Sequence, residues 1–595
     1  MVIMKRWVWF GLIIFFVLFS LFPTWYEITR RNDLQPNRYF ELIHNFPTDY
    51  NFYLSRIREG IEGRWTVVEK YTSEPHQGTF LHILYLAIGW AGAWNRVPWE
   101  RAGDAYHMAR IALAFVLLGL TMYLAKSGFK SFPWQILAFL LAVTASTWPK
   151  FVHEWDGWRF GGYMPWWSVM DSLQRITFLP HLLFGQSLIL FLLMSLANSD
   201  VLKKPGNWIF LGVAGFVMGI VFPPGILFVD TTLTIIIIIE AIYDWKELKS
   251  LEKQTLFSWG LDHIFPRLIF VILSAPSFLY LVLMTSFYPW KRLAELDVIQ
   301  PLPFQYPEYL KAVGPILAFG LIGLVIALFL RNRRMIVNVA WVISWILLLA
   351  IFKFIPQQSP LRFSEMIPHV PLGMLTAFAS YVLFEHMRSR KPTNPLTKMF
   401  RLPKISIALW NQKKIVTPGI TGNIAAFGIL AVPTILLVLN FGILYSSWLW
   451  QRDFVDHKIR AEFPLVPTGS YVMYPLKDFI AGMKFIQDAS QRNDVILSET
   501  TAGNYMPVYS GNTVYVGHDN TVNAAAKKAR VSAFFSGAIP TNEAQSWISK
   551  ERFRYIYYGP QEREENNWDK HLEKKYPFLR AVYQNDYVTV YEPTI

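Results

Sequence analysis

The sequence contains no cysteine, so neither disulfide bonds nor thiolate metal ligands are available to the protein. Charge is also scarce, because 16% of the 595 residues are charged, whereas about 25% is usual in soluble domains. Hydrophobic residues account for 53% of the chain, and the mean hydropathy is +0.27. These values exclude an ordinary soluble globular protein and indicate a chain that crosses a membrane many times.

Apolar runs long enough to span a membrane recur along the first three quarters of the chain. A helix needs roughly 17–25 apolar residues to cross about 30 Å of hydrocarbon. Such runs are predicted at 7–23, 106–125, 133–149, 180–198, 207–222, 225–243, 266–285, 311–330, 335–354, 367–386 and 421–447. The pattern therefore predicts a polytopic α-helical membrane domain over residues 1–450, with about eleven transmembrane helices.

Basic residues outnumber acidic ones, 56 to 42, and they collect in alternate loops, which marks those loops as cytoplasmic. The cytoplasmic set comprises Lys5, Arg6, Lys126, Lys130, Lys203, Lys204, Lys246, Lys249, Lys253, Arg331, Arg333, Arg334 and the basic residues of 387–420. We expect a plasma-membrane protein with a cytoplasmic N-terminus and an extracytoplasmic C-terminus. Anionic lipid headgroups and this bias explain the net charge of +14 without a nucleic acid partner.

The first outer loop, residues 24–105, is long and contains a second apolar stretch at 79–94. Treating that stretch as a span would place every later basic loop outside the cell, and the stretch is short for a crossing. We therefore expect a helix lying at the membrane interface. It would pair with an amphipathic helix over 49–60, whose apolar face carries Phe52, Tyr53, Ile57 and Ile61.

The composition changes after a linker at 451–467, because charged residues become frequent again and apolar runs shorten to strand length. Helices are predicted at 474–489, 523–535 and 541–552, and strands at 494–498, 513–517, 554–559 and 587–591. Residues 468–595 are thus predicted to form an extracytoplasmic α/β domain, with helices on the faces of a small sheet.

Ionisable residues gather on the predicted outer side, where they are costly unless they are paired or functional. The first loop contributes Asp49, Glu74 and His76; the second contributes Glu154, Asp156, Asp171, Arg175 and His181; a later loop contributes Arg362, Glu365 and His369. Their location on one side predicts a functional site at that face.

Simpler explanations remain open for several of these residues. Asp49 directly precedes a predicted helix and could act as its N-cap. Arg362 and Glu365 have the i,i+3 spacing of a helical ion pair. Glu154 and Asp156 could belong to a solvated turn. His181 could simply lie at the membrane interface, and the polar run 518–520 could be a loop after a strand.

This layout resembles the GT-C superfamily of membrane glycosyltransferases, which includes protein O-mannosyltransferases, aminoarabinose transferases and oligosaccharyltransferases. The resemblance rests on the long outer loop that opens with Asp49-Tyr50, the span entrance Pro180-His181, and the loop Arg362-Phe363-Ser364-Glu365 before a late span. The segments 510–518 and 557–563 look like the tail of uncharacterised bacterial members. The Trp-Trp-Asp-Tyr-Gly acceptor motif of oligosaccharyltransferases is absent from the sequence.

The resemblance implies an inverting transfer of a sugar from a polyprenyl-phosphate donor to a lipid, glycan or protein acceptor at the outer face. Asp49 would be the base, with Glu74 and Asp171 as the other eligible carboxylates. Arg362 and Arg175 would stabilise the departing phosphate. Further substrate or phosphate contacts would come from Tyr50, His76, His181 and Glu365. No cofactor is certain; if Mg²⁺ or Mn²⁺ is used, Glu154 and Asp156 are the expected ligands.

Two other classes of function compete with this interpretation. A transporter or flippase for a lipid-linked or polar substrate would carry internal repeats or broken, charged helices at the bilayer midplane, and neither is evident in the sequence. A non-catalytic envelope assembly protein would use the C-terminal domain to bind a partner.

Overall fold

The computed structural model describes residues 2–250, 253–355, 358–388, 420–467 and 473–594. These residues fall into two compact units. Unit 1 comprises Met1–Leu21, Arg110–Ser277 and Leu302–Trp450, and unit 2 comprises Phe22–Ala109, Phe278–Pro301 and Gln451–Ile595. The predicted basic connection 387–420 lies largely outside the described residues. The first outer loop and the C-terminal segment thus belong to the same unit, although they are distant in sequence.

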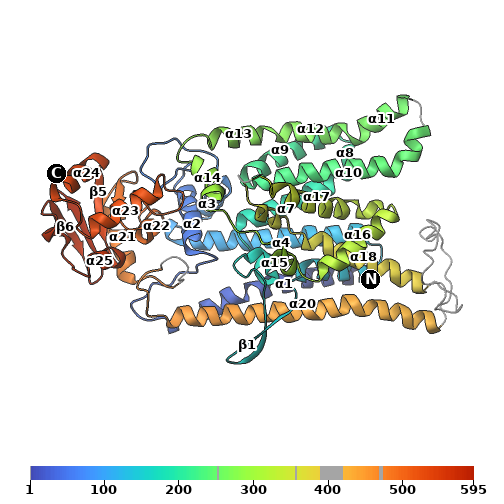
Figure 1. The fold of residues 1–595 in the computed structure, drawn as a ribbon, viewed down its shortest axis with the longest axis horizontal. Coiled ribbons are helices and arrows are strands. Elements are labelled where there is room, and N and C mark those ends of the chain that lie inside the picture. Colours follow the sequence, from blue (N-terminus) through green and yellow to red (C-terminus); the bar gives the residue numbers. More distant parts are fainter. Residues whose placement is uncertain (1, 251–252, 356–357, 389–419, 468–472, 595) are drawn as a thin grey trace. The chain divides into compact units, whose positions relative to one another are not determined.

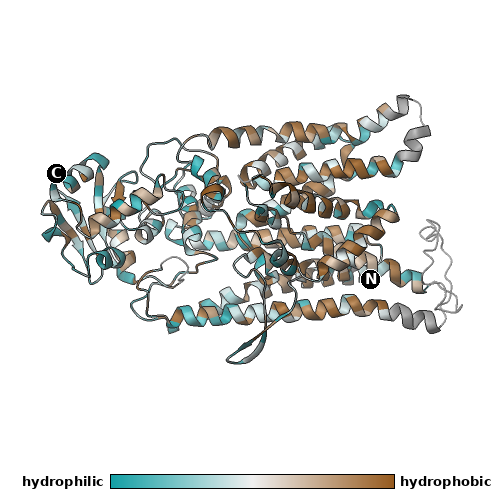
Figure 2. Ribbon diagram, in the orientation of Figure 1, coloured by the Kyte–Doolittle hydropathy of each residue, from teal (hydrophilic) through white to brown (hydrophobic). Residues whose placement is uncertain are grey.

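Unit 1 is a bundle of helices that run side by side (Figure 1). Its elements, some of which continue into unit 2, are α1 (Val2–Thr29), α4 (Ala102–Gly128), α5 (Phe132–Thr144), η3 (Ser168–Met170), α6 (Ser172–Ile176), α7 (Pro180–Leu196), α8 (Ser199–Leu202), α9 (Pro205–Val221), α10 (Pro223–Ser250), α11 (Lys253–His263), α12 (Phe265–Ser274), α13 (Pro276–Met284), α15 (Tyr306–Val313), α16 (Ile316–Phe329), η4 (Arg333–Met335), α17 (Ile336–Phe352), η5 (Pro360–Met366), α18 (His369–Arg388) and α20 (Ile420–Arg460). Hydrophobic residues dominate these helices (Figure 2).

All eleven predicted apolar segments are helical. Among the described residues, six helices are long and apolar enough to cross a membrane, or up to eight if each of two bent helix pairs is one span. The remaining three predicted segments correspond to α5, α7 and α9, which have 13, 17 and 17 residues. The prediction of a polytopic helical membrane protein is therefore confirmed.

Glycine and proline account for the bends in the apolar helices. Gly314 separates α15 from α16, which meet at 80°. Its φ is +85°, and a Cβ there would lie 1.8 Å from the carbonyl oxygen of Ser146, so only glycine fits. Pro276 begins α13 directly after α12, because proline cannot donate the hydrogen bond that would continue the first helix.

Unit 2 contains η1 (Arg30–Asp33), α2 (Pro47–Ile61), α3 (Ile83–Trp94), η2 (Trp99–Arg101) and α14 (Lys291–Ile299). Its C-terminal part contains α21 (Lys477–Ala489), β3 (Val495–Leu497), α22 (Thr500–Tyr509), β4 (Thr513–Val514), α23 (Ala524–Phe535), α24 (Thr541–Glu551), β5 (Phe553–Tyr558), α25 (Pro560–Glu565), η6 (Leu572–Lys574), β6 (Leu579–Gln584) and β7 (Thr589–Pro593). The five strands form one mixed sheet in the order β4-β3-β5-β7-β6.

The C-terminal sheet is parallel on one side and antiparallel on the other. Strands β4, β3 and β5 are parallel, and β7 is antiparallel to both β5 and β6. A core of buried aromatic and aliphatic side chains, among them Phe534, Trp547 and Ile556, lies between this sheet and helices α23 and α24. Every predicted C-terminal helix and strand has a counterpart here, and α22, α25 and β6 are additions.

The first-loop helices pair as predicted, because α2 crosses α3 at two glycines. A Cβ on Gly60 would lie 2.2 Å from the carbonyl oxygen of Leu86, and one on Gly89 would lie 2.2 Å from that of Ile57. Tyr53 and Tyr85 stack across the pair with ring centroids 4.3 Å apart. The helix over 83–94 has 12 residues, which is too few for a membrane span.

The expectation of a surface amphipathic helix at 49–60 is wrong in one respect. The polar side of α2 is not solvated, since Arg56, Arg58 and Glu59 are all buried. Arg58 donates to the carbonyl oxygens of Val508 at 2.6 Å and Ser510 at 3.3 Å, so the C-terminal segment covers the face that the sequence pattern assigns to solvent.

Candidate functional site

Asp49 lies in the first turn of α2, and its side chain is partly exposed to solvent. The N-cap of the helix is Phe46, and Pro47 occupies the first turn, so the interpretation of Asp49 as the N-cap is wrong. Its side chain is 44% exposed. The positive end of the helix dipole favours a carboxylate at this position. Asp49 is therefore an accessible carboxylate on a helix whose remaining faces are buried.

His518 of the C-terminal segment faces Asp49. Its Nε2 lies 3.6 Å from Asp49 Oδ1, and its side chain is 9% exposed. The backbone N–H of Asn520 donates to Nδ1 at 3.2 Å, which leaves the proton of the neutral ring on Nε2, directed toward Asp49. The ring also stacks on Phe52, with centroids 4.7 Å apart and planes 20° apart. Orientation and tautomer are thus both determined by contacts.

The loop that carries His518 is joined to the first loop by hydrogen bonds. Thr521 Oγ1 donates to the carbonyl oxygen of Tyr71 at 2.7 Å. On the other side, Asn51 donates to the side chain of Asn504 at 2.9 Å, and Asn504 donates to the carbonyl oxygen of Thr48 at 3.2 Å. The turn that presents Asp49 is therefore held by residues from α22 and from the loop after β4.

Glu74 and His76 are both engaged within unit 2. Lys527 lies 2.7 Å from Glu74 Oε1, and Thr72 donates to the other oxygen. Burial lowers the pKa of Lys527, although Glu74 acts in the opposite direction. The N–H of Glu69 donates to His76 Nε2 at 2.9 Å, so His76 Nδ1 carries the proton that bonds the carbonyl of Glu74. These contacts give both residues a role in shaping the loop.

Tyr50 does not face the same side as Asp49. It is 2% exposed, its ring packs against Tyr106 at 5.1 Å, and its hydroxyl lies 3.5 Å from His107 Nε2. The structure therefore places Tyr50 in the core beneath α2 and away from solvent, which does not suit the predicted phosphate contact.

Charged groups lie buried under α2 and stabilise its position. Arg56 pairs with Glu69 at 2.9 Å, with both side chains almost fully buried. Burial raises the pKa of Glu59 and lowers that of Lys70 to about 8. Lys70 donates to the carbonyl of Gly511, in the same stretch of chain that receives Arg58. The helix that carries Asp49 is thus embedded in a network of ion pairs and hydrogen bonds.

In unit 1, Asp171 and Arg175 have structural partners. Asp171 is the N-cap of α6 and accepts from the N–H groups of Leu173 at 2.7 Å and Gln174 at 3.2 Å. Burial raises its pKa, although these N–H groups act in the opposite direction. Arg175 is buried and donates to three carbonyl oxygens, and burial lowers its pKa to about 10. A guanidinium with these partners is less suited than Arg362 to meet a phosphate.

Arg362 and Glu365 form the ion pair that their spacing allows, with 3.6 Å between Nη1 and Oε1. Arg362 is 35% exposed, whereas Glu365 is 6% exposed. Their turn, η5, is held by Trp167, which donates to Ser364 at 2.6 Å, and by Gln186, which donates to the carbonyl of Glu365 at 2.9 Å. The partly exposed guanidinium is therefore presented by a rigid turn.

A strained residue follows η5. Ile367 has φ of +41° and ψ of +61°, a left-handed conformation that costs a β-branched residue roughly 1–3 kcal/mol. Trp341 donates to the carbonyl of the preceding Met366 at 2.9 Å, which helps to hold this conformation. Strain of this kind is typical of segments whose geometry matters for function.

Two histidines lie at the starts of helices in unit 1. His181 is the second residue of α7, which begins at Pro180 as predicted. His369 begins α18 and is fully buried, and neither ring nitrogen has a hydrogen-bond partner among the described residues. An unpartnered buried imidazole is destabilising, so the structure draws attention to His369 among the ionisable residues that the sequence groups on the outer side.

Glu154 and Asp156 lie on a β-hairpin formed by β1 (Lys150–Glu154) and β2 (Gly157–Gly161), which projects from the helices of unit 1 (Figure 1). Asp156 sits in the turn and pairs with Arg159 through both oxygens. In the part of the chain that the structure describes, no group of three or more His, Asp or Glu side chains is arranged to hold a metal ion. Asp156 is thus already paired with a guanidinium, and Glu154 and Asp156 as ligands of Mg²⁺ or Mn²⁺ stay a prediction.

Comparison with known proteins identifies the fold. The sequence matches no protein-family model and no curated protein. The apo oligosaccharyltransferase of Archaeoglobus fulgidus is similar in structure, with a TM-score of 0.52 and 11% identity over 99% of this chain and 75% of that one. The oligosaccharyltransferase AglB of Archaeoglobus fulgidus, in complex with an inhibitory peptide and a dolichol-phosphate, has a TM-score of 0.50 and 11% identity over 97% and 73%.

A further solved structure is ArnT from Cupriavidus metallidurans bound to undecaprenyl phosphate. It has a TM-score of 0.46 and 12% identity, and the match covers 98% of both chains. The similarity to the oligosaccharyltransferase shows that this chain has the fold of the GT-C membrane glycosyltransferases. The predicted resemblance is thus confirmed at the level of the fold.

Sequence reasoning found His518 and its two neighbours polar enough to line a site, but a loop after a strand explained them equally well. The residue follows a predicted strand, and this local signal is equally typical of a loop. Its pairing with Asp49 depends on a contact between segments more than 450 residues apart. The signal in the sequence that points to His518 is its position as a polar residue directly after a buried strand.

Proposed function

We propose that the protein is an integral membrane glycosyltransferase that moves a sugar from a polyprenyl-phosphate donor to an acceptor at the outer face of the membrane. The observation that carries this proposal is Asp49 itself. It is an accessible carboxylate in the first turn of a buried helix, and Nε2 of His518 lies 3.6 Å from it, within a GT-C fold. A positioned carboxylate is what an acceptor hydroxyl needs in order to lose its proton as it attacks.

The proposed step is a direct displacement. The acceptor oxygen forms a bond to the anomeric carbon while the bond from that carbon to the phosphate oxygen breaks. Asp49 takes the acceptor proton, and the polyprenyl phosphate departs with the electron pair. A single displacement inverts the anomeric carbon. His518, whose Nε2 lies 3.6 Å from Asp49 Oδ1, is the proposed positioning residue for the carboxylate.

Negative charge accumulates on the departing phosphate, so a fixed cation would lower the barrier. Arg362 is the proposed cation, because its guanidinium is partly exposed and its turn is rigid. Glu365 positions Arg362, and the donors of Arg175 are used by carbonyl oxygens. Glu74 and Asp171 are less suited than Asp49 to act as the base, since their oxygens already accept from Lys527 and from backbone N–H groups.

The test is sugar transfer by the purified protein from a panel of polyprenyl-phosphate sugars to lipid, glycan and peptide acceptors. The Asp49→Asn variant is expected to lose transfer by about 10²–10⁴-fold, because the base is removed. Asp104→Asn is the matched control, since Asp104 also lies in the first turn of a helix and is 50% exposed. Thermal unfolding of both variants checks the fold.

Equal transfer by the two variants would refute Asp49 as the base. Absence of transfer from every donor, in wild type and variants alike, would favour a transporter or an assembly protein over an enzyme.

A further inference from the structure

The β1–β2 hairpin presents exposed aromatic side chains outside the helix bundle. Figure 1 shows the hairpin extending sideways, across the direction in which the membrane helices run and past α20. Phe151, Trp155 and Trp158 are 64%, 82% and 71% exposed. Large aromatic rings that are gathered on one projecting segment mark a surface that contacts something outside the chain.

Alternation along the two strands places aromatic rings on one side of the hairpin. Phe151 is paired with Phe160 in the strand register, and His153 is paired with Trp158. The ring centroids of these two pairs lie 5.0 Å and 5.2 Å apart. Because alternate residues of a strand point to the same face, these four residues form one aromatic face.

The other side of the hairpin carries charge. Lys150, Val152 and Glu154 alternate with the aromatic residues of β1, and Arg159 lies on the same side of β2. Arg159 is buried, and its guanidinium pairs with Asp156 in the turn. The hairpin thus has an aromatic face and a polar face, which is typical of a strand pair between an apolar and an aqueous medium.

Contacts with α20 determine how the two faces are oriented. The ring of Phe160 packs on Gly442, where a Cβ would lie 3.1 Å from it. The N–H of Phe160 donates to Ser446 at 3.0 Å, and the guanidinium of Arg159 lies over the ring of Trp450 at 5.4 Å. Gly442 and Trp450 are about 12 Å apart along the helix. The aromatic face is therefore directed toward the middle of α20, and the polar face toward its C-terminal end.

The side of α20 that carries the hairpin is a lipid-facing surface. Val438 lies one turn before Gly442 on this side and is 66% exposed. The predicted apolar run of the helix ends at residue 447, between Ser446 and Trp450. The aromatic face is therefore at the level where hydrocarbon gives way to headgroups, and it continues the surface that α20 presents to lipid.

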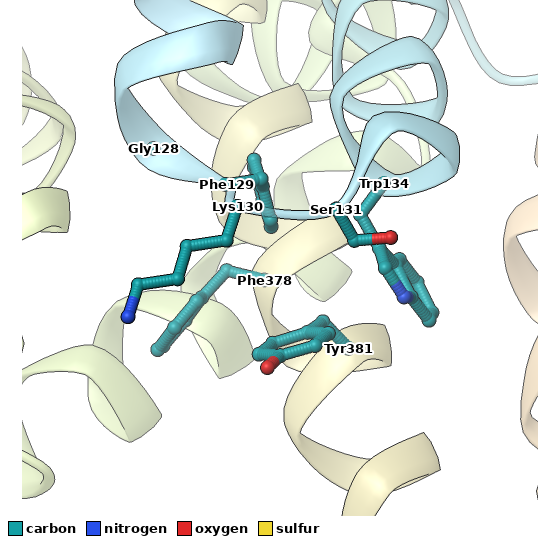
Figure 3. A pocket seen from close by; sticks show the side chains of 7 residues that line it. All are labelled: Gly128, Phe129, Lys130, Ser131, Trp134, Phe378 and Tyr381. Atoms are coloured by element: carbon teal, nitrogen blue, oxygen red, sulfur yellow. The ribbon is translucent and has the colours of Figure 1, made fainter. Parts of the chain in front are cut away.

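The path of the chain before the hairpin agrees with this level. Figure 3 shows Trp134 and Tyr381 lining a hollow together with Lys130, and such residues collect at a membrane boundary. From there α5 rises about 20 Å over its 13 residues. The non-helical residues 145–149 can add at most about 18 Å. This path is long enough to cross about 30 Å of hydrocarbon and to bring β1 to the opposite boundary.

We propose that the hairpin lies flat in the headgroup region of the bilayer, on the side that the sequence predicts to be extracytoplasmic. Its aromatic face contacts the glycerol and upper acyl carbons of phospholipids, and Lys150 and Glu154 on the polar face meet water. The hairpin thereby anchors unit 1 to lipid beyond the outline of the helix bundle. This role is independent of the transfer reaction.

The absence of cysteine allows a test with single labels, since one introduced cysteine is the only site of reaction. The full chain is labelled with bimane, placed in lipid nanodiscs and quenched by iodide or by phospholipids that carry a nitroxide near the headgroup or deep in the acyl chain. Trp158→Cys reports on the aromatic face, and Glu154→Cys is the matched control on the polar face of the same hairpin. Val438→Cys is the reference for lipid and Trp568→Cys, in the C-terminal segment, is the reference for water.

We expect the label at position 158 to lose most fluorescence to the shallow nitroxide and the label at position 438 to lose most to the deep one. Labels at positions 154 and 568 should lose most to iodide. Phe151→Cys repeats the measurement on the aromatic face, and thermal unfolding checks the fold of each variant.

Iodide quenching at position 158 as strong as at position 568, without quenching by either nitroxide, would overturn the proposal by placing the hairpin in water. Equal quenching by the shallow nitroxide at positions 154 and 158 would overturn the flat orientation. Protection of position 158 from all three quenchers would also overturn the proposal, because a second protein chain would then cover the aromatic face.

Discussion

Glu499 is a buried carboxylate whose protonation should control the stability of the C-terminal sheet. It lies just after β3, where it is 6% exposed, and its Oε1 has no hydrogen-bond partner among the described residues. Its neighbour Glu562 accepts from the N–H groups of Glu499 at 2.7 Å and Gly559 at 3.0 Å. Burial, and then the charge of Glu562, raises the pKa of Glu499 to about 8.

The direction of the effect follows from proton linkage. The unfolded chain releases this proton near pH 4.5, whereas the folded protein keeps it until about pH 8. The folded state therefore binds more protons between these values, and stability falls as the pH rises through that window. Each pH unit is worth about 1.36 kcal/mol, so Glu499 costs the folded protein at most roughly 5 kcal/mol at pH 8.

Replacing Glu499 by glutamine removes this cost, because the amide is neutral at every pH and keeps an oxygen for the N–H of Thr500. The assay is thermal unfolding of wild type, Glu499→Gln and the exposed control Glu564→Gln, at pH 5 and pH 8. We expect Glu499→Gln to match wild type at pH 5 and to unfold at a higher temperature at pH 8. Parallel pH profiles for the three proteins would refute the reasoning.

Two further variants test buried groups in each unit. Replacing Arg56 by methionine should destabilise unit 2 by roughly 3–5 kcal/mol, because Glu69 is left buried without its partner, and the double variant Arg56→Met/Glu69→Leu should recover most of the loss in a denaturation series. Replacing His369 by leucine should raise the melting temperature, because this removes two buried nitrogens that have no hydrogen bond to any described residue. A lower melting temperature in the leucine variant would contradict that reasoning.

The sequence predicted the elements whose signal is local. Apolar runs identify membrane helices because burial in lipid depends on composition alone, and all eleven predicted runs are helical. Helix α22 was missed because it is buried on nearly every side and contains Pro507, so it shows neither the periodicity nor the composition of a surface helix.

The candidate site could be predicted only in part, because its geometry depends on contacts between distant segments. Asp49 was recognisable from its place in the first loop. The helical pattern of the sequence assigns a charged residue such as Arg58 to the solvent side. In the structure Arg58 is buried, because the carbonyl oxygens of Val508 and Ser510 accept hydrogen bonds from its guanidinium. The pairing of His518 with Asp49 has the same origin, since no local pattern relates the two residues.

The hydrogen bond from Arg58 to Val508 joins residues that are 450 positions apart, which affects how the protein is made. At about 5–20 residues per second, a ribosome needs roughly 20 to 90 seconds to travel from one residue to the other. During that time Arg58 and Lys70 have none of their C-terminal acceptors, while the intervening membrane helices are being inserted. A nascent chain that stops short of its end would therefore expose the defect near its beginning, as unpaired buried charges open to proteolysis.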